Sequence, residues 1–207
     1  MKPFVTKMSL AAAVIAALTT ATSAHAQQSQ QQPSFDKLGV SYINYDLDGE
    51  TLNGAGLQFN RSINQDWFFD VNYIYATDDY TVSGFDVDAT SSTLYGNLGF
   101  KFYQMNNMVA YASGGLVYNE IDIDTSGAGN FSEDDTGWNA QIGMRTRLTD
   151  AFEVDANVRH VDIYDDSDQE WSISGQYYIN RDFSLGLGYT LVDSDNNYVA
   201  LSGNFHF

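Results

Sequence analysis

The sequence contains no cysteine, and its two prolines, Pro3 and Pro33, both lie near the N-terminus. Without disulfides, an exported chain must obtain its stability from its fold or from a membrane. The absence of proline after residue 33 suits a closed sheet, because the hydrogen-bond ladder of such a sheet uses every backbone N–H. No apolar run after the N-terminal region reaches the ~18 residues of a transmembrane helix. The remaining chain is therefore expected to be soluble or a transmembrane barrel.

The N-terminus has the features of a secretory signal peptide. Two lysines precede a short apolar run that ends at about Leu18, and Ala24-His25-Ala26 forms a small-x-small cleavage site. An uncleaved N-terminal anchor is the alternative. We predict a signal peptide over residues 1–26, a flexible polar lead-in over residues 27–34 and a single domain over residues 35–207.

Apolar and polar side chains alternate with a period of two through most of residues 35–207, which predicts strands. The ten strands expected span about 38–47, 53–63, 67–77, 90–102, 108–119, 137–148, 152–163, 170–179, 183–193 and 197–207. A tilted strand needs about 9–11 residues to cross a bilayer, and most of these segments are long enough.

The expected connections alternate between tight turns and mostly longer acidic loops. The longer set lies around residues 48–52, 78–89, 120–136, 164–169 and 194–196. Short turns at one end and longer loops at the other are typical of a closed, antiparallel, up-and-down barrel of an outer membrane. An even number of strands would place both termini at the short-turn end, in the periplasm.

Each strand has one apolar face, and aromatic residues stand at both ends of these faces. Those at the turn end are Trp67, Phe102, Phe152, Phe183 and Phe205, and those at the loop end are Tyr75, Trp138, Trp171 and Tyr189. Two aromatic girdles around an aliphatic band suit an exterior that faces lipid. Neither a soluble sandwich nor a soluble ligand-binding barrel requires paired girdles.

The chain ends YVALSGNFHF, in which Leu201, Phe205 and Phe207 lie on the apolar face of the last strand. This pattern resembles the C-terminal signature of outer-membrane barrels, which implies recognition by the barrel-assembly machinery. More broadly, the chain resembles the small outer membrane protein β-barrel domain families: opacity-like, outer-membrane protein A-type and attachment–invasion-type. Those families usually have eight strands, so a barrel of eight strands is the alternative to ten.

The polar face carries paired charges. Counting back from the turn at residues 149–151 places Arg147 opposite Glu153 and Arg145 opposite Asp155, and opposed residues on one face interact. These charges could line a pore or form a packed polar core. We favour the core, because side chains mostly fill the interior of so narrow a barrel.

Acidic residues dominate the expected loops. Removal of residues 1–26 leaves 7 Lys and Arg (9 minus 2) against 27 Asp and Glu, and twenty of the acids lie in or beside the longer loops. Such a rim repels nucleic acid and attracts cations. It is either a solvated surface or one that divalent ions bridge to the phosphates of outer-membrane lipid.

Residues 122–133, DIDTSGAGNFSE, have the spacing of a calcium-binding loop. Asp122, Asp124 and Ser126 fall at positions 1, 3 and 5, and Glu133 falls at position 12, as in an EF-hand. The flanking residues are typical of strands rather than helices. These four residues are the candidate ligands for Ca²⁺, with an accidental spacing in an Asp-rich loop as the alternative, and no other cofactor is expected.

A catalytic site is not expected. Only His160 and His206 follow the signal peptide, and His160 has Asp162 nearby, a pair that could activate water. However, motifs of barrel proteases and acyl hydrolases are absent, and the alternation slips near Arg159–His160, which indicates a bulge. We expect a monomeric, non-enzymatic outer-membrane barrel with a structural or surface-interaction role. A narrow, porin-like, cation-preferring channel and a hydrolase that uses His160 are the alternatives.

Overall fold

The structure is a computed structural model that describes residues 32–47, 50–82, 85–127, 129–193 and 196–207. The predicted signal peptide and residues 27–31 of the predicted lead-in lie outside the described residues. Within the described ranges, all regular structure is β-strand, and no helix long and apolar enough to cross a membrane is found.

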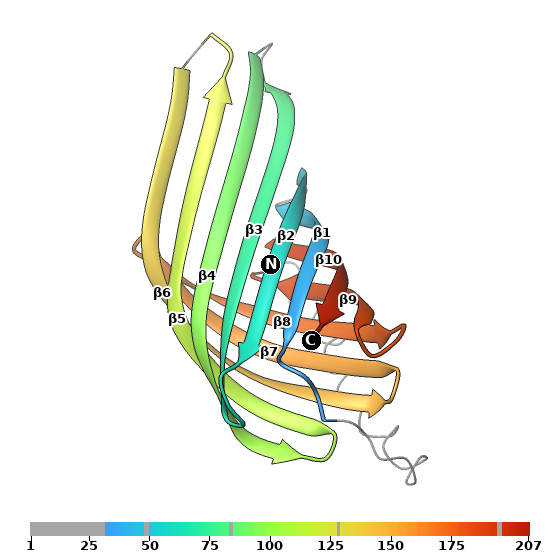
Figure 1. Ribbon diagram of the computed structural model, residues 1–207. Helices are drawn as coiled ribbons and strands as arrows, with labels where there is room; N and C mark the ends of the chain where they lie inside the picture. The colour runs from blue at the N-terminus through green and yellow to red at the C-terminus, as the bar shows by residue number, and fades with distance from the viewer. Residues whose placement is uncertain (1–31, 48–49, 83–84, 128, 194–195) are drawn as a thin grey trace, which may run out of the picture.

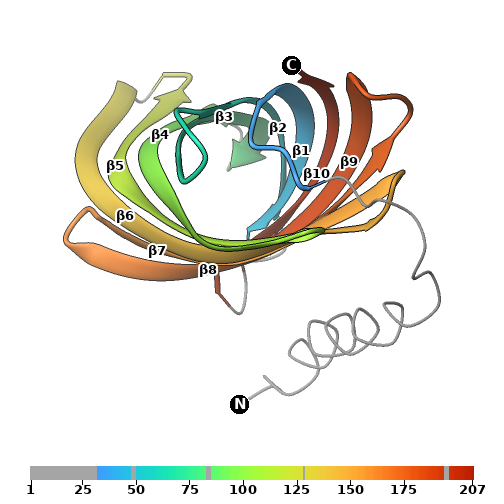
Figure 2. The same cartoon turned by 60° about the horizontal axis from the view of Figure 1, so that its bottom comes forward.

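Ten antiparallel strands close into a barrel (Figures 1 and 2). Their bounds are β1 (Lys37–Leu47), β2 (Glu50–Ser62), β3 (Trp67–Val82), β4 (Phe85–Met105), β5 (Met108–Thr125), β6 (Gly129–Thr149), β7 (Phe152–Ile163), β8 (Asp166–Tyr178), β9 (Phe183–Leu191) and β10 (Asn196–His206). Each strand pairs with its neighbours in sequence, and β1 pairs with β10. The predicted up-and-down barrel of ten strands, rather than eight, is confirmed.

The strands differ greatly in length. β4 and β6 each have 21 residues, whereas β9 has 9, and β3–β6 form a tall wall beside the shorter strands (Figure 1). The prediction of loops at 78–89 and 120–136 was therefore wrong, because β3–β4 and β5–β6 continue as ladders. The acidic residues there alternate with Val87, Ile121 and Ile123, which favour strands.

The two ends of the barrel differ in the turns that they carry. The short-turn end carries the turns that follow β2, β4, β6 and β8, and the hairpin end carries the turns that follow β1, β3, β5, β7 and β9. The part of the wall at the hairpin end, residues 78–82, 85–91, 117–125 and 129–137, is called the protruding sheet. Only its four strands pair there, since the β6–β7 ladder begins at Trp138 and the β2–β3 ladder at Thr77.

The outward face of the barrel is apolar between two rings of aromatic residues. Leu116 and Leu187 are 64% and 60% exposed, although both are aliphatic. Exposed aromatic residues lie at the short-turn end (Trp67, Phe102, Phe183 and Phe205) and toward the hairpin end (Tyr75, Trp138 and Trp171). A belt of this kind matches the hydrocarbon core and the interfaces of a bilayer.

The ladders are regular except at the short-turn end. Register shifts occur in β4 beside Lys101 and in β6 beside Arg147. The bulge expected near Arg159–His160 is absent, because β6 and β7 pair in continuous register from Trp138 to Arg147.

Two glycines, one on β4 and one on β5, provide a test of how closely these neighbouring strands pack. A Cβ added at Gly115 would lie 2.0 Å from the backbone oxygen of Gly96, whereas a Cβ at Gly96 would meet no atom within 4 Å. We expect Gly115→Ala to lower the free energy of unfolding by about 1–3 kcal/mol through overpacking, and Gly96→Ala to leave it nearly unchanged. Urea unfolding in lipid vesicles measures both, and equal losses would contradict the close approach of β4 and β5.

Candidate functional site

Buried charged side chains gather inside the barrel near the short-turn end. Arg145 and Asp155 are directly opposed on β6 and β7, and Arg145 Nε donates to Asp155 Oδ2 at 2.8 Å. Glu153 Oε1 lies 3.8 Å from the same nitrogen, and the hydroxyl of Tyr111 donates to Asp155 Oδ1 at 3.0 Å. One guanidinium therefore lies within ion-pair distance of two carboxylates in a buried network.

Arg147 is opposite Glu153 in the register, but its guanidinium has other partners. Its Nη2 donates to the backbone oxygen of Asp150 at 2.9 Å, and its Cζ lies 3.8 Å from the ring centroid of Tyr178. The Tyr178 hydroxyl in turn donates to Glu153 Oε2 at 3.2 Å. Tyr178 thus connects the two charges through its ring and its hydroxyl.

Phe35 closes the lumen at the short-turn end. Its side chain is 1% exposed, and its ring centroid is 4.5 Å from that of Phe68 and 5.4 Å from that of Tyr111. The Arg145 guanidinium and the Lys101 ammonium lie over the same ring at 4.2 and 4.7 Å. We call the cluster of Phe35, Phe68, Val109 and Tyr111 the Phe35 stopper.

The segment that carries Phe35 is fixed to the barrel wall. The backbone oxygen of Ser34 accepts a hydrogen bond from Arg145 Nη1 at 2.7 Å. Asp36 Oδ1 accepts one from the backbone N–H of Ser62 at 2.8 Å. These bonds hold residues 34–36 across the mouth of the lumen.

A second packed layer closes the lumen toward the hairpin end. The apolar layer consists of Ile43, Ile74, Tyr95, Val117 and Val161. Beside it, Arg159 Nη1 donates to Glu170 Oε2 at 3.1 Å, and Arg159 Cζ lies 4.4 Å from the ring centroid of Tyr95. The lumen is therefore filled by side chains at two levels.

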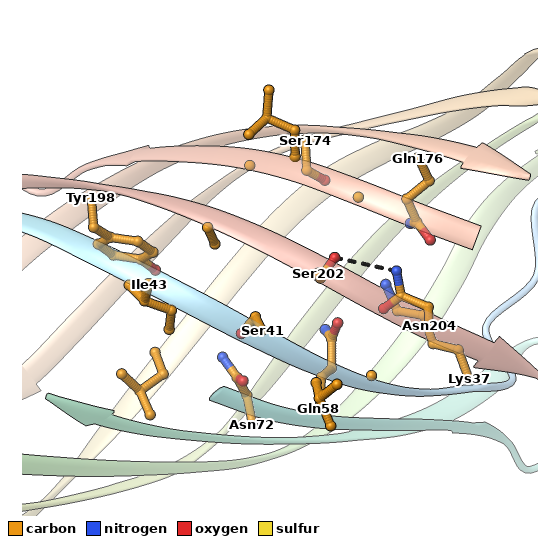
Figure 3. A pocket seen from close by; sticks show the side chains of 17 residues that line it. Lys37, Ser41, Ile43, Gln58, Asn72, Ser174, Gln176, Tyr198, Ser202 and Asn204 are labelled. Carbon is orange, nitrogen blue, oxygen red and sulfur yellow. Dashed lines mark hydrogen bonds between the residues drawn. The ribbon is translucent and has the colours of Figure 1, made fainter. Parts of the chain in front are cut away.

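A polar chamber remains between the Phe35 stopper and the apolar layer, and Figure 3 shows the side chains around its larger cavity. It comprises two adjoining cavities of about 160 and 120 Å³, which share Lys37, Gln58 and Ser174 in their walls. Amides and hydroxyls form most of the polar lining. A chamber of this size and polarity can hold several waters.

The two faces of the protruding sheet differ in character. On the outward face, Asp88 is directly opposite Asp124, and Glu120 is directly opposite Asp134. The inward face presents the apolar residues Val87, Ile121, Ile123 and Phe131 beside Glu133 and Asp135. Like charges in direct opposition destabilise a sheet, so the acidic face reduces the stability of the ladder that carries it.

The hairpin does not bring the predicted calcium ligands together. Asp122 and Asp124 lie on the outward face of β5, whereas Glu133 is opposite Ile121 and therefore lies on the inward face. The backbone N–H of Ser126 donates to a neighbouring hairpin. Among the described residues, no group of three or more His, Cys, Asp or Glu is placed to hold a metal ion.

The turn between β7 and β8 folds against the inward face of the wall. Tyr164 and Asp165 have positive φ angles of 57° and 59°, as a tight two-residue hairpin requires. The Tyr164 N–H donates to Asp135 Oδ2 at 2.7 Å, and its hydroxyl donates to Asn119 Oδ1 at 3.0 Å. Desolvation and the carboxylates of Glu133 and Asp135 raise the pKa of Tyr164, so its hydroxyl remains a donor.

The two histidines lie on opposite faces of the barrel wall. His160 is on the outward face, with its ring centroid 5.1 Å from that of Trp138, and it lines neither lumenal cavity. His206 faces the lumen and shares a 2.8 Å hydrogen bond between its Nε2 and Ser184 Oγ. The hydrolase alternative gains no support from these positions.

The C-terminal residues lie on the outward face at the short-turn end. Leu201, Phe205 and Phe207 are all exposed there. The ring of Phe207 is stacked 6.0 Å from that of Phe59, and the guanidinium of Arg61 lies 5.1 Å from its centroid. The last residue is thus held against β2, one strand beyond the β1–β10 seam.

Three prominent residues were not predicted. Phe35 and Lys37 continue the inward phase of β1 through Gly39 and Ser41, so extension of the alternation by two residues could have found them. Tyr164 had no comparable signal, because its partners come from β5 and β6.

Comparison with known proteins supports the architecture. The family described as outer membrane protein beta-barrel domain matches residues 11–190. No curated protein matches the sequence. The translocator domain of the autotransporter NalP from Neisseria meningitidis is similar in fold, with a TM-score of 0.51 and 9% identity over 97% of this chain and 96% of that chain.

Two further solved structures are less similar. The attachment invasion locus protein Ail of Yersinia pestis, in complex with the heparin analogue sucrose octasulfate, has a TM-score of 0.43 and 12% identity, over 82% of this chain and 94% of that one. The N-terminal β-barrel domain of Pseudomonas aeruginosa OprF has a TM-score of 0.40 and 14% identity, over 87% and 100%.

The buried network leads to a stability prediction. We expect Arg145→Ala and Asp155→Ala each to lower the free energy of unfolding by about 3–5 kcal/mol, because each leaves a charge buried without its partner. The double variant should be more stable than either single variant. Thermal unfolding midpoints measure this, and equal midpoints for the single and double variants would contradict the pairing.

Proposed function

The chain belongs to the outer membrane protein beta-barrel domain family, and we propose that it is a non-enzymatic barrel that is sealed to solutes and displays an acidic sheet at the cell surface. The main support for this proposal is that side chains fill both ends of the lumen, while strands β3–β6 continue well beyond the aromatic belt. The family places the protein in the bacterial outer membrane. We propose in addition that the lumen is closed to solutes, that the short-turn end faces the periplasm, and that the protein acts at the cell surface.

The short-turn end is assigned to the periplasm. Both described termini lie there: Lys37 pairs with His206, and the N-terminal segment enters the lumen from this side. Short turns on the periplasmic side and longer extensions outside are the usual arrangement of such barrels. The protruding sheet then stands outside the cell, and Phe207 lies at the periplasmic rim, where the barrel-assembly machinery would read it.

The packed layers argue for a sealed barrel. The Phe35 stopper fills the periplasmic mouth, and five buried residues with the Arg159–Glu170 ion pair fill the lumen near the other end. A conducting pore needs a continuous path of water, and packed side chains occupy the lumen at both layers. The cation-preferring channel is therefore the weaker hypothesis.

The protruding sheet argues for an interaction surface. Its outward face concentrates acidic side chains, and β6 has an unpaired edge from Gly129 to Gly137, because the β6–β7 ladder starts at Trp138. Unpaired strand edges are exposed to pairing with other chains, and charged residues restrict which chains can pair. Cationic partners, either basic polypeptides or divalent ions that bridge to lipid phosphates, fit this charge.

Conductance tests the sealed lumen. In planar bilayers the wild-type protein should show no steady conductance. The triple variant Phe35→Ala, Ile43→Ser, Ile74→Ser thins both layers and should conduct, which also verifies insertion. Steady conductance of the wild type at the level of the triple variant would overturn the sealed barrel.

Binding of a basic peptide tests the surface role. We expect a lysine-rich peptide to bind vesicle-reconstituted barrels, with affinity that falls as salt rises. Asp122→Asn with Asp124→Asn should weaken binding about twofold to thirtyfold, since each exposed ion pair contributes about 0.2–1 kcal/mol. Asp150→Asn with Asp182→Asn removes the same charge from the short-turn end and should have no effect. Equal effects of the two double variants would contradict a localised surface.

A further inference from the structure

The larger lumenal cavity has an unusual charge composition. It is bounded by residues of β1, β2, β3, β8, β9 and β10, and the only charged side chain in its lining is Lys37. The remaining polar groups are amides, including Gln58 and Gln176, and hydroxyls, including Ser174 and Ser202. Figure 3 shows these side chains around the cavity, with Lys37 next to Asn204.

Glycines shape this cavity. A Cβ at Gly39 would lie 2.4 Å from Asn204 Oδ1, and a Cβ at Gly186 would lie 2.3 Å from Ser202 Oγ. Glycine at these two positions lets Asn204 and Ser202 occupy their places in the wall. The polar lining therefore depends on specific residues of three neighbouring strands.

Lys37 is buried without a contacting counter-ion. Its side chain is 6% exposed, and none of the ion pairs formed among the described residues includes it. The nearby carboxylates have other partners: Asp155 and Glu153 are held by Arg145, and Asp70 accepts amide donors of two asparagines. A charged group withdrawn from water without a partner carries a large free-energy cost.

The other groups of the cavity can supply donors. The hydroxyl of Ser184 donates to Gln176 Oε1 at 3.3 Å, which leaves the N–H donors of Gln176 for other partners. Serine hydroxyls rotate and can donate to whatever acceptor is present. The larger cavity thus has one ammonium, several N–H and O–H donors and no carboxylate in its lining, whereas Asp70 and Asp155 line the adjoining smaller cavity. Of the two cavities, the larger one has the lining suited to an anion.

We propose that this cavity binds one small monovalent anion, a halide or a short carboxylate, against Lys37. One ammonium matches one negative charge. The cavity volume of about 160 Å³ corresponds to roughly five waters at ~30 Å³ each, so a small anion fits with part of its hydration shell. Multiply charged anions exceed the single positive charge of this lining.

The anion reaches this site from the short-turn end. The smaller cavity shares Lys37 with the larger one and has Phe35 in its wall. Phe35 also lines an open vestibule of about 810 Å³ at the short-turn end. Transient displacement of Phe35 would join the vestibule to the chamber, while the apolar layer keeps the far side closed, so the anion binds without crossing the barrel.

Bromide is the probe that tests this proposal, because it scatters anomalously and resembles chloride. Crystals of the refolded wild-type protein, grown at pH 7 and soaked in bromide, should show an anomalous peak in hydrogen-bond range of Lys37 Nζ. Lys37→Met, which keeps the length of the side chain, should lose this peak and retain any surface sites. Water alone at Lys37, or bromide only elsewhere, would overturn the proposal.

A solution measurement supplies the second test. At constant ionic strength, replacement of gluconate by bromide should raise the thermal midpoint of the wild type in a saturable way and leave that of Lys37→Met unchanged. If Lys37→Met does not fold, Gly188→Leu retains Lys37 but fills the cavity, and a Cβ there has only ordinary contacts, the nearest at 3.5 Å. An equal bromide effect in wild type and variant would overturn the proposal. Because no surface acid is involved, this outcome is independent of the peptide experiment.

Discussion

Closure between β1 and β10 is the constraint on which the rest of the structure depends. Within the apolar belt every strand then pairs on both sides, so no strand edge faces lipid. The seam register, with Leu38 opposite Phe205, also fixes which side chains point inward, because a slip of one residue would exchange the two faces of a strand. This register places Lys37 in the lumen and Phe205 on the belt.

Much of the fold could be predicted because its determinants are local. Period-two alternation located all ten strands, and counting from the turn at residues 149–151 located the Arg145–Asp155 opposition. The extensions of β3–β6 could not be predicted in this way. Their acidic residues are typical of loops, and only pairing of Ile121 and Ile123 with neighbouring strands shows that these residues form a sheet.

Less of the candidate site could be predicted, because it depends on contacts between distant segments. The packing of Phe35 against Phe68 and Tyr111, and the contact of Tyr164 with Asn119, leave no periodic trace in the sequence. The four residues predicted to bind calcium lie apart for a different reason. Its spacing assumes a loop that wraps around an ion, whereas a hairpin places Asp122 and Glu133 on opposite faces.

The packing of Phe35 in the lumen also has a consequence for the order in which the molecule folds. The hydrogen bond between Ser34 and Arg145 joins residues that are 111 positions apart. The aromatic rings that contact Phe35 belong to β3 and β5. Contacts over such separations form late, because the entropy of loop closure must be offset before they add stability. The first described residues of the chain are therefore expected to be among the last to become ordered. Phe35 would pack into the lumen only after the strands of the barrel have paired.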